Sequence, residues 1–82
     1  MNVLEFVVQW DDGRWMMRSP DGEAERFHTE DEALRAADRA ARIANHDRFD
    51  SRVIRLGSDG ARHLVRSYGR HPLIAGDTRA AL

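Results

Sequence analysis

Two hairpin-turn signals on either side of one helical pattern constrain the fold of this chain most strongly. Asp12-Gly13 and Asp59-Gly60 each lie between two apolar-rich runs, and residues 30–45 between them carry apolar side chains at helical spacing. Asp-Gly is favoured in two-residue hairpin loops because those loops need positive φ angles. The order predicts an α+β domain, β-β-α-β-β, in which a four-stranded antiparallel sheet has one helix packed on one face.

The first hairpin has a self-consistent register. Residues 3–10 alternate, so that Leu4, Phe6, Val8 and Trp10 share one face. Folding about the first turn places Trp10 opposite Trp15, and we expect this cross-strand pair to lie on the core side.

The helix begins at a capping box and has a narrow apolar stripe. Thr29 and Glu32 have the spacing at which each side chain bonds the other's backbone amide. The stripe is mostly alanine, which allows close approach to a sheet: Ala33, Leu34, Ala37, Ala40, Ala41 and Ala44. Just before the helix, residues 25–28 are expected to add a short extended piece with Phe27 turned inward.

The second hairpin is expected to place Ile54, Leu56 and Val65 beneath the helix with the apolar side of the first. The other side of the sheet would then be uncovered, and apolar patches of this kind often mark contacts. The residues predicted to form this interaction face are Val3, Val7, Met16, Arg18, Val53, Arg55, Leu64, Arg66 and Tyr68.

This uncovered face predicts a non-enzymatic protein-interaction or regulatory module, expected to be a homodimer, with an unidentified protein as another possible partner. Residues 1–32 hold three Arg and nine acids, whereas residues 33–82 hold ten Arg and five acids. Such a split favours head-to-tail charge complementarity.

Single-stranded nucleic-acid binding is the alternative hypothesis. Tyr68 would stack on a base, and Arg55, Arg62, Arg66 and Arg70 would contact phosphates. One aromatic residue is a small platform, and a pI near 6.4 is far from the basic footprint of such proteins. All 13 basic residues are Arg, which either phosphate recognition or codon bias would explain.

The composition argues against several other classes. The chain has 82 residues, too few to wall a deep catalytic cleft, and no cysteine, so that it has neither disulfides nor thiolate metal ligands. No two of its four histidines have the helical spacing of a metal pair, and a trio of Asp59, His63 and Ser67 lacks a nucleophile elbow. We therefore expect no catalytic, cofactor-binding or metal-binding residues. No apolar run is long enough to span a bilayer, and we expect a cytoplasmic protein.

Several short motifs, in their order, resemble a small bacterial family called domain of unknown function 2188. They are Gly13-Arg14-Trp15, Thr29 to Ala33, Asp59-Gly60 and Ser67-Tyr68-Gly69. The resemblance covers residues 4–69 and implies a compact β-β-α-β-β domain without assigned catalytic residues. The family is usually richer in lysine and tends to end near the Ser-Tyr-Gly. We expect one domain over residues 1–69 and a tail, 70–82, that is mobile or docks on a partner.

Overall fold

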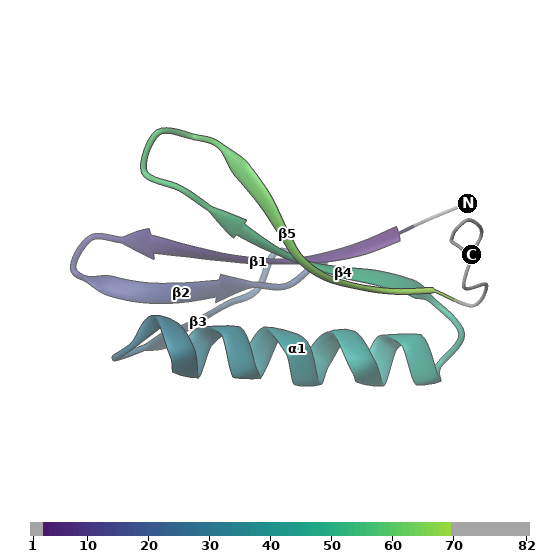
Figure 1. Cartoon of the computed structure of the whole chain (residues 1–82). Helices are drawn as coiled ribbons and strands as arrows, with labels where there is room; N and C mark the ends of the chain where they lie inside the picture. The colour runs from purple at the N-terminus through teal and green to yellow at the C-terminus, as the bar shows by residue number, and fades with distance from the viewer. Residues whose placement is uncertain (1–2, 70–82) are drawn as a thin grey trace.

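The sheet has five strands in a mixed arrangement, with a single helix across one face (Figure 1). The computed structural model describes residues 3–69. In chain order its elements are β1 (Val3–Asp11), β2 (Arg14–Arg18), β3 (Ala24–Phe27), α1 (Glu30–His46), β4 (Asp50–Leu56) and β5 (Arg62–Tyr68). The α+β class is confirmed, and the tail 70–82 lies outside the described residues.

The strand order is β3-β2-β1-β4-β5, and this corrects the expected four-stranded antiparallel sheet. The extended piece before the helix is a fifth strand, β3, which pairs antiparallel with β2. The two hairpins join through β1 and β4, which run parallel. A parallel pair is connected by a crossover through the helix instead of by a turn, so no turn signal in the sequence announces it.

The first hairpin confirms the predicted register, with Trp10 opposite Trp15. Their rings meet edge to face, with centroids 5.5 Å apart, a favourable arrangement for aromatic pairs. Asp12 and Gly13 both have positive φ, as the tight loop requires. Trp10 is nevertheless 55% exposed, so the core expected to include it ends before the tip of this hairpin.

The helix packs through its alanines as predicted. Ala33, Ala37, Ala41 and Ala44 are buried, and the capping box between Thr29 and Glu32 is complete. The core beneath them consists of Phe6, Val8, Met17 and Val53, with Phe27 packed against it from β3. Buried Ser51 donates a hydrogen bond of 2.7 Å to the backbone oxygen of Ala41, which shows how closely β4 approaches the helix.

The second hairpin turns the opposite way from the prediction. Val53, paired with Phe6 across the parallel strands, lies under the helix and is 1% exposed, so Ile54 and Leu56 on the alternate positions face away. The physical reason lies in the close approach of β4 to the helix, seen in the hydrogen bond from Ser51 to Ala41, which suits the small side chains of Ser51 and Val53 at this strand.

A β-bulge further changes the pairing of this hairpin. Val53 pairs with Arg66 as expected, but Ile54 pairs with Leu64, which leaves Val65 as the extra residue. Bulges bend a strand and increase its twist. In Figure 1 the tip of the β4–β5 hairpin accordingly rises away from the helix, whereas the tip of β1–β2 stays beside it.

Candidate interaction face

The side of the sheet turned away from α1, here called the open face, is the candidate functional surface. It is assigned by strand alternation and register. Its residues are Val3, Glu5, Val7, Gln9, Asp11, Arg14, Met16, Arg18, Ala24, Arg26, Asp50, Arg52, Ile54, Leu56, Arg62, Leu64 and Ser67.

An aliphatic row crosses the middle of the open face. Val7, Ile54 and Leu64 are successive partners on β1, β4 and β5. Met16 and Leu56 lie in the neighbouring row, on either side of Gln9. Leu64 is 61% exposed, but Ile54 and Met16 are only 5% and 3% exposed although no described element covers them.

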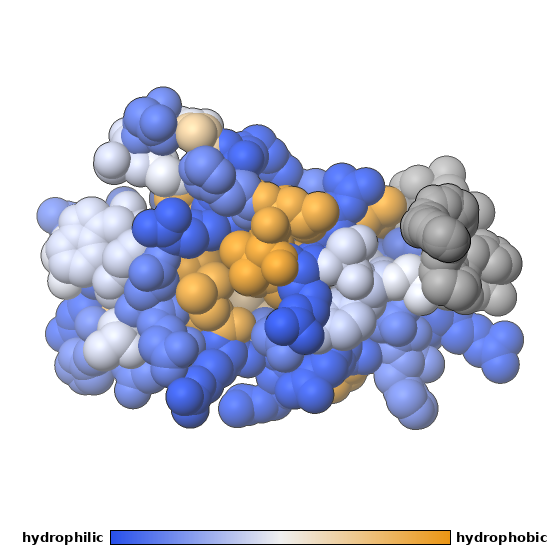
Figure 2. Space-filling view, viewed as in Figure 1, coloured by the Kyte–Doolittle hydropathy of each residue, from blue (hydrophilic) through white to orange (hydrophobic). Residues whose placement is uncertain are grey.

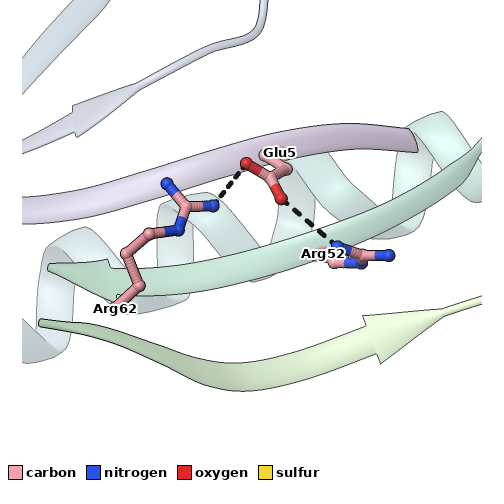
Figure 3. Close-up of polar contacts among 3 residues, drawn as sticks. All are labelled: Glu5, Arg52 and Arg62. Atoms are coloured by element: carbon pink, nitrogen blue, oxygen red, sulfur yellow. Dashed lines mark hydrogen bonds and ion pairs between the residues drawn. The ribbon is translucent and has the colours of Figure 1, made fainter. Parts of the chain in front are cut away.

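An ion-pair bridge explains the burial of Ile54. Glu5 accepts hydrogen bonds from Arg62 at 2.6 Å and from Arg52 at 3.4 Å (Figure 3). Arg52 is the direct partner of Glu5, whereas Arg62 belongs to a row on the far side of Ile54. The aliphatic stem of Arg62 must therefore cross the Ile54 row to reach Glu5, and such stems cover apolar atoms while the charged end stays in water.

The open face is cationic although the described chain is not. It holds five arginines and three carboxylates, a formal charge of +2, whereas the remaining described residues hold six arginines and ten carboxylates, a formal charge of −4. In the fold the charges are also divided between the two faces of the sheet, because Arg14, Arg18 and Arg26 from the acidic half of the chain join arginines from β4 and β5.

Two of these arginines are available for an external anion. Arg52 and Arg62 bind Glu5, and Arg26 lies 3.7 Å from Asp11. Arg14 and Arg18 are exposed and have no carboxylate partner among residues 3–69. Arg18 continues the aliphatic row on β2 as the partner of Val7, and Arg14 lies opposite Asp11 at the end of the same strand. A ligand with both acidic and apolar groups could therefore contact Arg18 and the aliphatic row together.

The structure divides the predicted interaction face between the two sides of the sheet. Val3, Val7, Met16, Arg18 and Leu64 lie on the open face, as expected. The other four predicted residues, Val53, Arg55, Arg66 and Tyr68, lie on the helix side. The prediction that all nine share one surface is therefore wrong, and the cause is the inverted second hairpin.

The groups proposed for nucleic-acid binding are not gathered on one surface either. Arg55 forms an ion pair with Glu30 at the start of the helix, while Arg62 is on the opposite side of the sheet. The Tyr68 hydroxyl donates a 2.5 Å hydrogen bond to Asp38. Partial burial and this bond raise the pKa of Tyr68 above its ordinary value, with Arg66 acting in the opposite direction.

The groups considered for other chemistry are separated as well. His63 and Ser67 pair with Arg55 and Arg52, which lie on opposite faces, and the Asp59 carboxylate accepts a turn hydrogen bond from the amide of Ala61. Within residues 3–69 no three His, Asp or Glu side chains are grouped as a metal site would need. His71 and Arg70 lie outside the described residues.

Sequence reasoning missed several residues of the open face. Ile54 and Leu56 were expected in the core, and the bridge between Glu5 and the arginines of β4 and β5 was not anticipated. The available signal was the close approach implied by the alanine stripe, which favours Ser51 and Val53 under the helix.

Comparison of the chain with protein-family models, curated proteins and solved structures found no match. Within the described residues, no helix is both long and apolar enough to cross a membrane.

Proposed function

We propose that this protein is a non-enzymatic interaction module whose open face binds an acidic protein segment carrying aliphatic side chains. The observation that supports this proposal is the aliphatic row set among five arginines, on a domain whose other described residues are net acidic. Charge of this kind directs a partner to one face, and the aliphatic row supplies apolar area to bury.

A second copy of the chain is a poorer occupant of this face. Two open faces brought together would each contribute a formal charge of +2, and like charges facing each other oppose association. An acidic partner has no such penalty and can pair with Arg14 and Arg18. The homodimer, the cytoplasmic location and the resemblance to domain of unknown function 2188 stay predictions.

The chemistry of the open face also favours protein over single-stranded nucleic acid. Its described residues include no Phe, Trp or Tyr, so bases have no stacking platform there. The sheet's aromatic residues instead lie on the helix side, as in the Trp10–Trp15 pair and Phe27. Aliphatic side chains such as Leu64 match the side chains of a peptide better than the planar faces of bases.

Fluorescence anisotropy with three labelled probes tests the proposal. The first probe is a short peptide of alternating acidic and leucine residues, the second is polyglutamate, and the third is oligothymidine of matched charge. We expect the acidic-leucine peptide to bind most tightly and to weaken as salt rises. Tighter binding of oligothymidine would support the nucleic-acid alternative, and no binding of the peptide at low salt would contradict the proposal.

Matched variants locate the binding surface. Arg18→Glu on the open face should weaken peptide binding about tenfold or more, which corresponds to about 1.4 kcal/mol. Arg39→Glu reverses an exposed helix arginine that has no ion pair within residues 3–69, and it should have little effect. Leu64→Asp and Ile43→Asp are the matched variants at apolar positions, with Ile43→Asp as the control. The side chains of Leu64 and Ile43 are 61% and 58% exposed, but only Leu64 is on the open face.

A further inference from the structure

Strand β1 has an unpaired edge over its N-terminal half. On one side β4 accompanies β1 from Val3 to Gln9, but on the other side the pairing with β2 ends where Val7 meets Arg18. In Figure 1 the arrow of β2 accordingly ends near the middle of the sheet, while β1 continues toward the N-terminus. Residues 3–6 therefore have no strand partner on the β2 side within residues 3–69, and this stretch is here called the β1 gap.

The turn after β2 explains why the same chain does not continue into the β1 gap. The Ser19 amide donates a 2.8 Å hydrogen bond to the Glu23 oxygen, and the Gly22 amide donates one of 2.9 Å to the Ser19 oxygen. These bonds close the turn on itself and lead the chain back into β3. Pro20 also has no N–H group with which to extend the ladder beyond β2.

Four backbone groups of β1 point into the β1 gap. Asp11 and Arg14 are the first and last residues of the tight turn, which makes them a hydrogen-bonded pair of the ladder. Every second residue of β1, counted back from Asp11, therefore directs its N–H and C=O toward the side of β2. Val3 and Glu5 belong to this set but lie beyond the end of β2, so their backbone groups can pair with an incoming chain.

An available arginine lies at the end of the β1 gap. Arg18, the last residue of β2, is exposed and has no carboxylate partner among residues 3–69. Glu5 borders the gap as well, but Arg52 and Arg62 engage its carboxylate from β4 and β5, and these three side chains have a formal charge of +1 (Figure 3). The charges nearest the end of β2 therefore favour a carboxylate of an incoming chain.

We infer that the acidic partner is anchored by a short extended segment that pairs with β1 in the β1 gap, in line with β2. This inference rests on the function proposed above and specifies where the partner's backbone docks. β2 stops the segment at Arg18 and α1 covers the helix side of the sheet, so the partner's chain leaves over the open face (Figure 1). There it meets Val7, the partner of Arg18 and the start of the aliphatic row. At about 3.3 Å per residue, the gap holds a segment of about four residues, with its carboxylate at the end next to Arg18.

The edge at β5 is a poorer site for an acidic segment. Figure 2 shows apolar side chains gathered near mid-length, above the helix, in the view where β5 passes in front of the other strands. Two arginines there are already paired, Arg62 with Glu5 and Arg35 with Asp31. Asp38 lines the hollow below β5. An acidic chain would therefore meet carboxylates at that edge, whereas the arginine at the β1 gap is available.

A second copy of the chain fits the β1 gap less well than an acidic partner. Its matching edge would offer residues 3–6, in which Glu5 is the single acid. That carboxylate already binds Arg52 and Arg62. It therefore leaves no carboxylate in the added segment for Arg18 of the facing copy.

Amide hydrogen exchange of the ¹⁵N-labelled full chain, with the acidic-leucine peptide, tests the inference. Exchange of the Val3 and Glu5 amides should slow at least fivefold when the peptide binds, because these amides point into the β1 gap. Slowing along β5 instead would place the peptide at the other edge and overturn the inference.

A peptide with methylated central backbone nitrogens keeps its side chains but cannot pair as a strand. It should bind at least tenfold more weakly than the unmodified peptide. Equal binding of the two peptides would overturn strand pairing. If Arg18→Glu still weakens that binding, the proposed function stands while the inference falls.

Two neutralising variants locate the partner along β2. Arg14 and Arg18 are the two ends of this strand, and both are exposed. Arg18→Gln, next to the β1 gap, should weaken peptide binding at least fivefold more than Arg14→Gln does. Equal effects of the two variants would overturn docking in the gap and leave the proposed function in place.

The protein without peptide gives a further test. Val3 and Glu5 amides that are already protected would show that the β1 gap is occupied, and this would overturn the inference. Protection that rises with protein concentration would identify a second copy as the occupant, and protection independent of concentration would identify another segment of the chain. Absence of any peptide binding would overturn the inference and the proposed function together.

Discussion

Arg62 on β5 reaches Glu5 on β1 at 2.6 Å across the intervening strand β4. This contact ties three strands together on the open face and covers Ile54, which is 5% exposed. The aliphatic stem of Arg62 explains the burial of Ile54. The stem is also the part of Arg62 expected to stabilise the fold, because exposed ion pairs alone contribute little to stability.

Two substitutions of Arg62 should separate the contribution of its aliphatic stem to stability from that of its charge. We expect Arg62→Ala to lower the free energy of unfolding by about 1 kcal/mol, because it uncovers Ile54 and removes the bridge. Arg62→Met keeps an apolar stem and should lose less than about half of that. Urea denaturation measures both variants, and equal losses would show that the charge, not the stem, stabilises this face.

Tyr68 should give the protein a loss of stability at high pH. Its pKa is raised in the folded state, so the folded protein holds the phenolic proton more tightly than the unfolded chain does. The stabilisation is complete below the unfolded pKa of about 10 and is lost as the pH rises through the folded pKa.

This pH effect has a direct readout because the chain has one tyrosine. In the folded protein, the absorbance of tyrosinate should appear at a higher pH than it does in the unfolded chain. Tyr68→Phe should remove the part of the stability loss above about pH 10 that comes from the tyrosine. Denaturation at each pH measures this loss. Identical titration curves for folded and unfolded protein would contradict the role of the Asp38 contact.

Arg48 is expected to destabilise the end of the helix. It follows the C-cap Asp47 with φ of 76°, a region that favours glycine because other residues have a Cβ atom. Arg48→Gly should raise the free energy of unfolding by about 0.5–1 kcal/mol, as measured by thermal or urea denaturation. Arg48→Ala keeps the unfavourable φ and should give no gain; an equal gain would attribute the effect to the arginine charge.

The sequence was sufficient to predict the local elements but not how they join. The Asp12-Gly13 turn, the Thr29 capping box and the alanine stripe are local signals, and the structure confirms them. The pairing of Phe6 with Val53 joins strands far apart in sequence through a parallel contact without a turn of its own.

The candidate site was harder to predict because it depends on the orientation of one hairpin. β4 carries apolar residues at adjacent positions, Val53 and Ile54, and both are buried on opposite sides of the sheet. Alternation alone therefore could not decide which of the two meets the helix. The bulge at Val65 then shifted the partners of Ile54, so the row from Val7 to Leu64 could not be derived from the length of the turn.

The assignment of the two faces is the central claim, and denaturation of one pair of variants tests it most directly. Val53→Asp introduces a carboxylate under the helix, at a position 1% exposed, and should cost more than about 3 kcal/mol or unfold the protein. Leu64→Asp, on the open face and 61% exposed, should stay within about 0.5 kcal/mol of the wild type. A stable Val53→Asp protein together with an unfolded Leu64→Asp protein would contradict the assignment.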